Sequence, residues 1–257
     1  MARMTDSKHN PAAKRGSPRT GLARALSKMG YCSRSAAQRL ITEGQVRVNE
    51  RTVRDPEEPV SLDKDEIQVG RTKIAVANKT YLMMNKPRGL VTTARDEKGR
   101  PTVYSLLPSG QEWLAPVGRL DKASEGLLLL TNDSKWAARI TNPESHMSKT
   151  YHVQISAKPD QHLLARLIAG VRESGELLRA KNALVIRRGE KNCWIEIVLD
   201  EGKNRHIRRM FSALEIEVVR LVRVAIGDLK LGDLAKGKVR ELTREEVNAL
   251  GVRQKTR

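Results

Sequence analysis

This sequence of 257 residues has few aromatic residues, only two cysteines and no long apolar run. Phe, Trp and Tyr make up 3% of the chain, too few for the aromatic stacking platform of an RRM-type sheet. Cys32 and Cys193 exclude a disulfide-rich scaffold and a four-cysteine zinc site, and they fit a reducing compartment. No stretch approaches the roughly 20 apolar residues of a membrane helix, and the N-terminal residues lack the apolar segment of a secretory signal. We therefore expect a cytoplasmic protein without a membrane partner.

Motifs for several common chemistries are also missing from the sequence. It contains no Walker A motif, no Rossmann glycine motif, no HExxH and no GxSxG. No second His or Cys stands at metal-ligand spacing from His206, which we expect at the surface. The sequence therefore predicts a protein that uses no metal and no cofactor.

Positive charge is what the sequence has in excess. The chain carries 48 Lys and Arg against 30 Asp and Glu, a formal net charge of +18. Such a surface attracts polyanions and raises their encounter rate. A membrane surface would require a basic helix with a strongly apolar opposite face, and the apolar helix faces here are better placed in a core. Nucleic acid is the favoured partner, and a basic protein without a polyanion ligand is the alternative.

The N-terminal part of the chain divides into a tail and a small module. Residues 1–20 predict a disordered basic tail. Residues 21–70 predict two short helices followed by strands, with Ser33 or Ser35 capping the second helix and Gly44 ending it. So small a module builds only a modest core. It is therefore typical of a docking surface, with three outward arginines: Arg24, Arg34 and Arg39.

A second pattern runs over residues 78–250 and is followed by a short basic tail, residues 251–257. Its many strands and irregularly spaced helices predict an α+β fold with a mixed, mostly antiparallel sheet flanked by helices. Leu127–Leu130 is a continuous apolar run, as in a strand buried on both faces. Asn204 is placed to cap a helix that carries Ile207 and Phe211 on its apolar face.

Three stretches of this region hold candidate functional residues. Asp121 lies in a polar turn before the leucine run, where partial desolvation creates a need for a partner. Pairing with Arg119 across the turn would make Asp121 purely structural. Arg208 lies at the edge of the apolar stripe of the helix that Asn204 is placed to cap, where it is able to hold a carboxylate with two hydrogen bonds. A solvated basic face explains the position of Arg208 equally well. Tyr151 begins a strand and either stacks on a base or belongs to the core.

Two sets of blocks resemble known families. SRSAAQRLITEGQVRVNERTV resembles the S4 RNA-binding domain, with Glu50 where that domain usually has Gly. Four further blocks, in order and spacing, resemble the RsuA/RluB/RluE/RluF family of rRNA pseudouridine synthases: NKPRGLVTT, GRLDKASEGLLLLTND, KTYHVQI and EGKNRHIRRMF, with His206 where Gln is common. The resemblance implies an S4-type α/β module followed by a pseudouridine synthase domain.

The resemblance also implies roles for single residues. Asp121 would be the catalytic aspartate, Arg208 its ion-pair partner and Tyr151 the ring that stacks on the target base, while Arg119 would bind substrate. Contacts to the RNA backbone would come from a set of basic residues: Lys86, Arg88, Arg205 and Arg209 in the catalytic part, and Arg24, Arg34 and Arg39 in the S4 module. No cofactor is implied, because the isomerisation of uridine has no net redox change and no group donor.

The expected partner is ribosomal RNA or a ribosome assembly intermediate. The blocks RPTVYSLLP and GDLKLG resemble those of members acting on large-subunit RNA, and no segment marks a dimer interface, so a monomer is expected. A non-catalytic, S4-containing rRNA-binding or ribosome-assembly factor is the alternative. A glycosidase would need a second positioned carboxylate and leaves the positive charge without a purpose.

Overall fold

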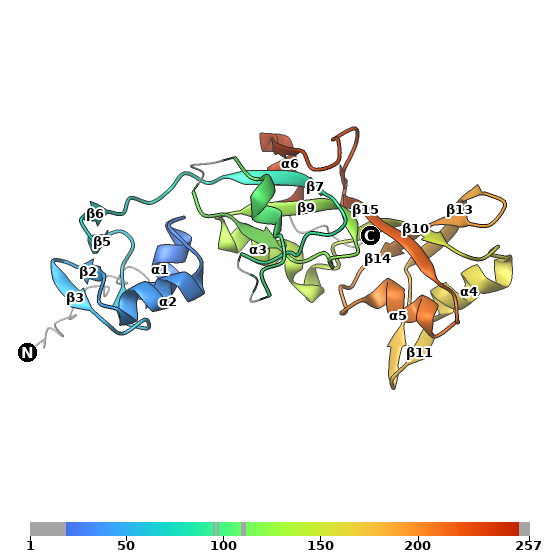
Figure 1. The fold of residues 1–257 in the computed structure, drawn as a ribbon, viewed down its shortest axis with the longest axis horizontal. Coiled ribbons are helices and arrows are strands. Elements are labelled where there is room, and N and C mark those ends of the chain that lie inside the picture. Colours follow the sequence, from blue (N-terminus) through green and yellow to red (C-terminus); the bar gives the residue numbers. More distant parts are fainter. Residues whose placement is uncertain (1–18, 95, 97, 109–111, 252–257) are drawn as a thin grey trace, which may run out of the picture. The chain divides into compact units, whose positions relative to one another are not determined.

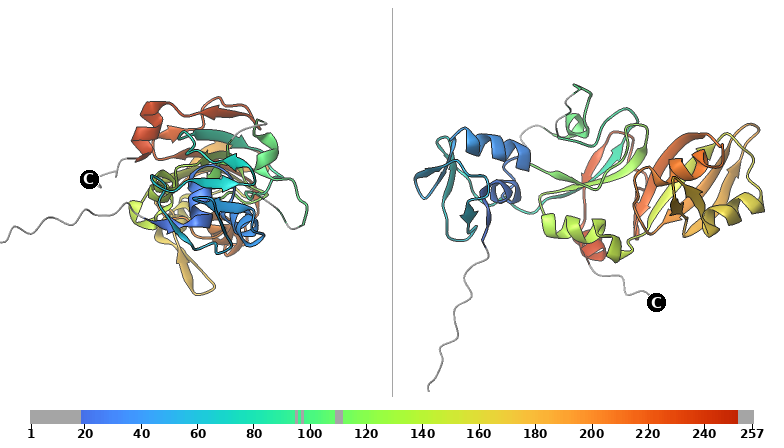
Figure 2. Two further views of the ribbon diagram at one scale, coloured as in Figure 1. Left: turned by 90° about the vertical axis from the view of Figure 1, so that its left-hand side faces the viewer. Right: turned by 90° about the horizontal axis from the view of Figure 1, so that it is seen from below.

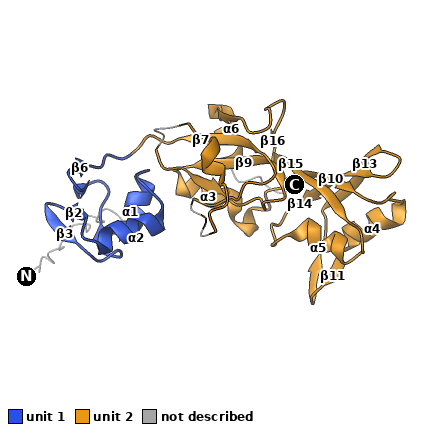
Figure 3. Cartoon of the chain, in the orientation of Figure 1, with its two compact units in different colours: residues 1–76 blue, residues 77–257 orange. Residues whose placement is uncertain are grey.

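The computed structural model describes residues 19–94, 96, 98–108 and 112–251. The chain divides into two units, residues 1–76 and residues 77–257, which are coloured separately in Figure 3. Most of the basic tail predicted over residues 1–20 lies outside the described residues. Of the tail predicted over residues 251–257, only Gly251 is described, as the last residue of helix α6 (Arg244–Gly251).

Residues 19–76 form a small α/β unit around one core. Its elements in chain order are β1 (Thr20–Gly21), α1 (Leu22–Lys28), α2 (Arg34–Thr42), β2 (Val46–Val48), β3 (Arg51–Val53), β4 (Pro59–Val60), β5 (Ile67–Val69) and β6 (Thr72–Lys73). Strands β3, β2, β5 and β6 form an antiparallel sheet in that order, and β1 pairs with β4. The two helices and the sheet share the core, in which Leu22, Leu26 and Ile41 are fully buried.

Local signals in this unit act as their residue types predict. The Ser33 hydroxyl accepts a hydrogen bond from the Ala36 backbone N–H at 3.2 Å, so Ser33 is the helix cap. Gly44, just beyond the helix end, has a φ of +75°. The β2–β3 turn places Asn49 and Glu50 at φ +48° and +67°, a conformation that favours Gly at the second position. The turn forms with Glu50 because the Asn49 side chain is fixed by hydrogen bonds to Asp65 and to the Glu66 backbone N–H.

The second unit is built on one nine-stranded sheet (Figures 1 and 2). The strands are β7 (Tyr81–Lys86), β8 (Ala115–Val117), β9 (Glu125–Thr131), β10 (Lys149–Ile155), β13 (Asn182–Arg188), β14 (Cys193–Leu199), β15 (Val218–Ile226), β16 (Leu229–Lys230) and β17 (Val239–Glu241). Their order is β13-β14-β10-β15-β9-β7-β17, with β16 beside β15 and β8 beside β9. All pairs are antiparallel except β15–β9, which confirms the predicted mixed, mostly antiparallel sheet.

Helices cover this sheet in two groups. The remaining elements are α3 (Ser134–Thr141), α4 (Gln161–Ala169), α5 (His206–Ser212), α6, the hairpin β11 (Val171–Glu173) and β12 (Glu176–Leu178), and the 3-10 turns Val103–Leu106 and Pro143–Ser145. Helices α4 and α5 pack on β10, β14 and β15, whereas α3 and α6 pack on the part that contains β9. None of the helices in the described ranges has the length and apolar character to cross a membrane.

Strand β9 is buried along its whole length. Leu127 and Leu129 belong to one core, with Trp136 of α3, while Leu128 and Leu130 belong to another on the opposite face of the sheet. This two-sided burial is the physical reason for the leucine run, because successive side chains of a strand point to opposite faces. The predicted buried strand is therefore confirmed, and its N-terminal end follows directly from the Asp121 turn.

Gly126 allows β9 and β15 to approach closely. In the parallel pairing, Gly126 lies opposite Arg223. A Cβ added to Gly126 would lie 2.2 Å from the Arg223 carbonyl oxygen, and Gly126 has a φ of +100°. Only glycine satisfies both conditions. Gly126 thus fixes the centre of the sheet where the strand after the Asp121 turn meets β15.

Candidate active site

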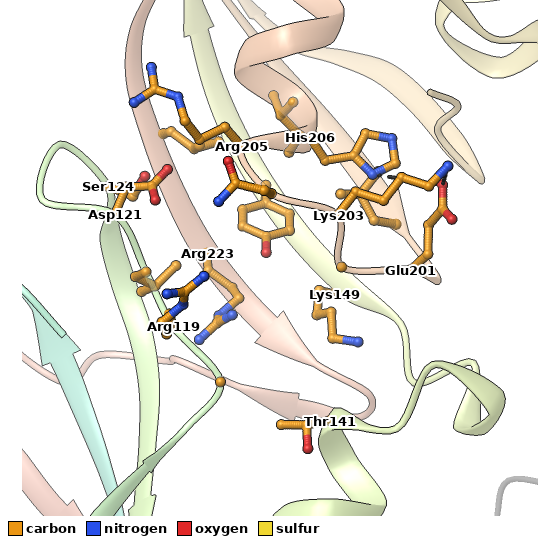
Figure 4. Close-up of a pocket in the computed structure, with 18 of the residues that line it drawn as sticks. Arg119, Asp121, Ser124, Thr141, Lys149, Glu201, Lys203, Arg205, His206 and Arg223 are labelled. Atoms are coloured by element: carbon orange, nitrogen blue, oxygen red, sulfur yellow. Dashed lines mark ion pairs between the residues drawn. The ribbon is translucent and has the colours of Figure 1, made fainter. Parts of the chain in front are cut away.

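A cavity of about 530 Å³ opens in the second unit beside Asp121. This volume lies within the about 300–1,000 Å³ typical of small-molecule sites. Five segments form its wall: residues 118–124, Thr141 with Pro143, the start of β10, residues 199–207 and the middle of β15. Figure 4 shows the labelled side chains converging from these segments, with Asp121 and Ser124 on the loop that precedes β9. The cavity therefore joins parts of the chain that are separated by up to about a hundred residues.

Asp121 is half-buried at the wall of this cavity. Among the described residues its carboxylate makes no hydrogen bond and no ion pair within 4.0 Å, so the turn pair with Arg119 is not formed. Backbone contacts hold the turn, since the Ser124 N–H donates to the Asp121 carbonyl at 3.0 Å. Thr92 fixes Leu120, the residue before Asp121, because the Thr92 hydroxyl donates to the Leu120 carbonyl at 2.7 Å. A fixed carboxylate is thus presented to the cavity without a partner.

Lys86 lies beneath the Asp121 turn, and its position corrects the prediction that it contacts the RNA backbone. Its side chain is 0% exposed. The ammonium donates to the carbonyls of Pro87, Asp121 and Ser124 at 3.1, 3.1 and 2.9 Å. Burial lowers the pKa of Lys86 to about 8, although the charges of Asp121 and Glu125 oppose this shift. Lys86 therefore holds the turn that carries Asp121 and is out of reach of a phosphate.

Arg208 is close to Asp121 but does not pair with it, which corrects the predicted ion pair. Its two terminal nitrogens donate to the carbonyls of Ala123 and Val218 at 3.2 and 3.3 Å. Burial lowers the pKa of the guanidinium, the neighbouring Arg205 adds to this shift, and the Asp121 carboxylate opposes it. Arg208 thus ties α5 to the Asp121 turn and acts on the carboxylate through its charge.

Tyr151 is half-buried and lines the same cavity as Asp121. It lies in the interior strand β10 and is paired across the sheet with Ile197 of β14 and Arg223 of β15. Both neighbouring strands therefore fix the direction of its side chain. The sequence block that contains Tyr151 is thus brought into one cavity with the block that contains Asp121.

Arg119 and Arg205 are exposed and line the cavity, and Arg88 is exposed on the loop after β7. Arg205 takes the position of the helix cap with a φ of +49°, and no side chain caps the helix there. The predicted cap at Asn204 is therefore wrong by one residue. No ion pair involves these three arginines within residues 19–94, 96, 98–108 and 112–251, so no carboxylate of those residues neutralises them.

Arg209 and Lys203 are already neutralised by carboxylates, mainly from the β11–β12 hairpin. Arg209 pairs with Glu173 at 2.6 Å and with Glu176 at 2.8 Å. Lys203 pairs with Glu201 at 3.1 Å and with Glu176 at 3.4 Å. This arrangement corrects the prediction that Arg209 contacts RNA, because two carboxylates already occupy its guanidinium. The network instead holds α5 on the hairpin.

His206 is buried, contrary to the expectation of a surface residue. It is 4% exposed, and neither ring nitrogen has a hydrogen-bond partner among the described residues. Burial lowers its pKa, and the charges of Lys203 and Arg209 act in the same direction, against Glu201 and Glu176. The lowered pKa favours the neutral form of the side chain, which packs at the start of α5 with its Nδ1 at 3.8 Å from the Glu201 carboxylate.

Sequence reasoning missed Lys149 and Arg223, which also line the cavity. Arg223 is 5% exposed and lies on the same face of β15 as the buried residues Leu221 and Ala225. The signal that could have identified Arg223 is a charged residue at an inward position of a predicted strand. The lining contains five Arg or Lys side chains against two carboxylates. No group of His, Cys, Asp and Glu able to hold a metal ion occurs in the described part of the chain.

The fold and site belong to an RNA-modifying enzyme, as matches to two family models show. A family model described as RNA pseudouridylate synthase matches residues 80–213, and a model of the S4 domain matches residues 20–67. The first match contains Asp121, Tyr151 and Arg208. The chain belongs to the RNA pseudouridylate synthase family and is a pseudouridine synthase with an S4 RNA-binding domain. The resemblance to the RsuA/RluB/RluE/RluF family is thereby confirmed.

Similar proteins match along nearly the whole chain. Ribosomal large subunit pseudouridine synthase B of Bacillus subtilis (strain 168) is 36% identical over 231 residues, which cover 89% of this chain and 94% of the relative. An uncharacterized RNA pseudouridine synthase of Aquifex aeolicus (strain VF5) is 37% identical over 88% of this chain and 91% of its own. A crystal structure of a pseudouridylate synthase has 32% identity and a TM-score of 0.63, covering 91% of this chain and 100% of its own.

Proposed function

We propose that this enzyme isomerises one uridine of large-subunit ribosomal RNA to pseudouridine, with Asp121 as the catalytic carboxylate. The observation that carries the proposal is the unpaired Asp121 carboxylate in one cavity with Tyr151. The relative from Bacillus subtilis, which is named for large-subunit RNA, supports the choice of substrate. The resemblance of the blocks RPTVYSLLP and GDLKLG to those of family members acting on large-subunit RNA agrees with this choice.

The reaction requires a reactive group beside the sugar of the target nucleotide. The C1′–N1 bond breaks, a C1′–C5 bond forms, a proton leaves C5, and N1 gains one, so no redox partner is required. A carboxylate is suited to attack the nucleotide or to accept its proton only while it is ionised. The Arg208 guanidinium, fixed on the backbone carbonyl of Ala123, holds a positive charge near this carboxylate.

Tyr151 supplies the surface for the base. A uridine in a folded RNA must leave its stack to enter the cavity, which costs a few kcal/mol. Stacking on the half-buried Tyr151 ring recovers part of this energy, about 1–3 kcal/mol per base. Arg119, Arg205 and Arg88, which are exposed and not ion-paired among the described residues, are placed to contact the phosphates around the flipped nucleotide.

Residues 21–70 act as the RNA-binding module and residues 78–250 as the catalytic domain in this proposal. The side chains of Arg24, Arg34 and Arg39 are exposed on α1 and α2, which suits sequence-independent contacts with phosphates. We place the enzyme in the cytoplasm as a monomer that meets rRNA or an assembly intermediate there. The sequence, with two cysteines and no apolar segment of membrane length, supports this placement.

The test is Asp121→Asn in the full chain, which keeps the shape of the side chain and removes its charge. We expect pseudouridine formation on a large-subunit rRNA transcript to fall by at least about a thousandfold, with RNA affinity unchanged within about threefold. Asp228→Asn, at an exposed position, is the matched control and should retain full activity. Full activity of Asp121→Asn would refute the catalytic role.

Mapping of pseudouridines in ribosomal RNA from a deletion strain tests the substrate. One large-subunit site should be lost and should return with the wild-type gene, but not with the Asp121→Asn variant. Loss of a small-subunit site would overturn the choice of RNA. An unchanged map would favour the alternative, a non-catalytic rRNA-binding or assembly factor.

A further inference from the structure

We propose that Arg223 and Lys149 form an anion subsite in this cavity that takes a phosphodiester group of the substrate RNA. The identity of the ligand rests on the proposed function, whereas the presence of an anion site rests on the geometry alone. Both residues line the cavity with Asp121 and Tyr151. Figure 4 shows Arg223 and Lys149 among the labelled side chains of the lining, on β15 and at the start of β10.

Arg223 is a buried cation with one hydrogen-bond donor that has no partner among the described residues. Its Nε donates to the Leu127 carbonyl at 2.8 Å, which fixes the orientation of the guanidinium. Its Nη2 is buried and has no hydrogen-bond partner among the described residues. A buried charged donor without a partner is destabilising, so such groups in native structures need an explanation. An anionic ligand in the cavity would supply the missing acceptor.

The position of Arg223 is set by three strands. In β15 it lies opposite Tyr151 of β10 on one side and opposite Gly126 of β9 on the other. The backbones of Gly126 and Arg223 are in close contact at this point. Because side chains of directly paired residues lie on the same face of a sheet, Arg223 lies beside Tyr151. The charge is therefore adjacent to the ring on which the base would stack.

Lys149 adds a second positive charge at the same place. It is half-buried, and burial together with the charge of Arg223 lowers its pKa, a shift that the Asp200 carboxylate opposes. Neither cation has a carboxylate within 4.0 Å among the described residues. Glu125 pairs with Arg220 and Lys236, and Glu201 pairs with Lys203, whereas the Asp121 carboxylate of the same cavity forms no ion pair among the described residues. The two charges repel each other unless an anion lies between them.

A phosphodiester of RNA fits these conditions. The planar guanidinium of arginine matches the oxygens of a phosphate, and lysine binds it as a point charge. A uridine that enters the cavity brings its own phosphate with it. Contacts of this kind fix the register of the nucleotide without reading the base. Arg223 and Lys149 would thus place the sugar of the target nucleotide beside Asp121.

The test compares the affinities of uridine and uridine 5′-monophosphate for the full chain, measured by NMR titration. We expect the wild type to bind the monophosphate about tenfold or more tightly than uridine. Arg223→Gln should remove this preference while uridine affinity stays within about threefold, and Lys149→Gln should reduce the preference in part. Arg166→Gln, at an exposed position of α4, removes one charge elsewhere and should change nothing.

The subsite would be overturned by equal affinities of the wild type for uridine and its monophosphate, or by an Arg223→Gln variant that keeps the full preference for the monophosphate. It would also be overturned if inorganic phosphate bound as tightly as the monophosphate, which would mean a site for free anions. If Arg223→Gln does not fold, as judged by thermal melting, Lys149→Gln at the half-buried position decides. This binding test is independent of turnover. A wild type that prefers the monophosphate but forms no pseudouridine would therefore refute the proposed function and not the subsite.

A second measurement uses rRNA itself. Loss of one phosphate contact should reduce the slope of log affinity against log salt concentration by about one. Arg223→Gln should show this change, and Arg223→Lys should restore the slope without full restoration of kcat, since an ammonium lacks the planar fork. An unchanged slope in Arg223→Gln would assign Arg223 a purely structural role.

Discussion

In residues 19–76, the side chains of Arg24, Arg34 and Arg39 are exposed and form no ion pair among the described residues. In the second unit, Arg208 and Arg223 are half-buried and buried, and their guanidinium groups bond to backbone carbonyls of other elements. The first set is hydrated and free to follow any RNA backbone, while the second set is partly dehydrated and held in one direction. The two units thus contain the same residue type in opposite environments.

This difference predicts different consequences of mutation. Exposed charges act through a screened, long-range attraction that depends on salt and is shared among several residues. Fixed and partly desolvated charges act on a single place, where the lower dielectric strengthens their effect. We therefore expect large effects on the reaction from single changes in the second unit, and small additive effects on binding from changes in the first.

Among the replacements of basic residues, Arg208→Ala should have the largest effect and would sharpen the comparison. It removes the fixed charge near Asp121 and the link between α5 and the Ala123 carbonyl. We expect kcat/KM on rRNA to fall about 10²- to 10³-fold, or about 3–4 kcal/mol of transition-state stabilisation. Steady-state kinetics with a pseudouridine assay measures this value.

Arg209→Ala is the matched control on the same helix. It removes the ion pairs with Glu173 and Glu176, so it should lower the melting temperature and change kcat/KM by less than about threefold. Equal rates for Arg208→Ala and the wild type would show that the fixed charge is not used in the reaction.

Lys86→Met should have the next largest effect. The carbonyls of Pro87, Asp121 and Ser124 lose their shared donor, so the turn that carries Asp121 loosens. We expect a loss of about 1–3 kcal/mol of unfolding free energy and a fall in kcat of about 10²-fold, because small displacements at the reacting centre are costly. Denaturant unfolding and single-turnover kinetics measure the two effects, with the exposed Lys158→Met as control. An undiminished kcat would mean that the turn keeps its shape without Lys86.

The triple replacement of Arg24, Arg34 and Arg39 by Gln should have a moderate effect. We expect rRNA affinity to fall about tenfold at low salt and the slope of log affinity against log salt concentration to fall by about two to three. The kcat should stay unchanged, since these residues lie outside the catalytic unit. Filter binding at several salt concentrations tests this result.

A control triple variant removes the same amount of charge at exposed positions of the second unit: Lys158, Arg166 and Arg172, each replaced by Gln. Its affinity should change less than that of the S4 variant. If both triple variants weaken rRNA binding equally, the S4 unit contributes to affinity only through its charge. The proposed difference between the arginines of the two units would then be contradicted.

His206→Gln should have the smallest effect, visible only with pH. Burial lowers the pKa of His206 in the folded state, whereas an unfolded chain has a pKa near 6.5. Below about pH 6.5 the unfolded state therefore binds more protons, and stability falls as the pH falls. Replacement by Gln should make the loss of melting temperature between about pH 7.5 and about pH 5.5 smaller by a few degrees. An identical loss in both proteins would show that His206 contributes nothing to the acid sensitivity.

Local features of the fold were predictable from the sequence because short-range interactions produce them. The Ser33 cap and the leucine strand β9 depend on neighbouring residues or on the alternation of one strand. The burial of Lys86 and His206 was not predictable in this way. Their side chains are covered by segments distant in sequence. The alternation that Lys86 shares with Leu82 and Met84 in β7 does not show which distant carbonyls its ammonium meets.

The sequence by itself determined the charge of the protein, its two-part division, the family and the blocks that carry Asp121, Tyr151 and Arg208. Only the tertiary structure decided which cations remain open to a ligand. Carboxylates of a distant hairpin neutralise Arg209, whereas Arg223, held in β15 between β9 and β10, lines the cavity and has a buried donor without a partner among the described residues. The physical reason is that ion pairing and desolvation depend on distances of a few ångströms between segments far apart in the chain, which no local pattern records.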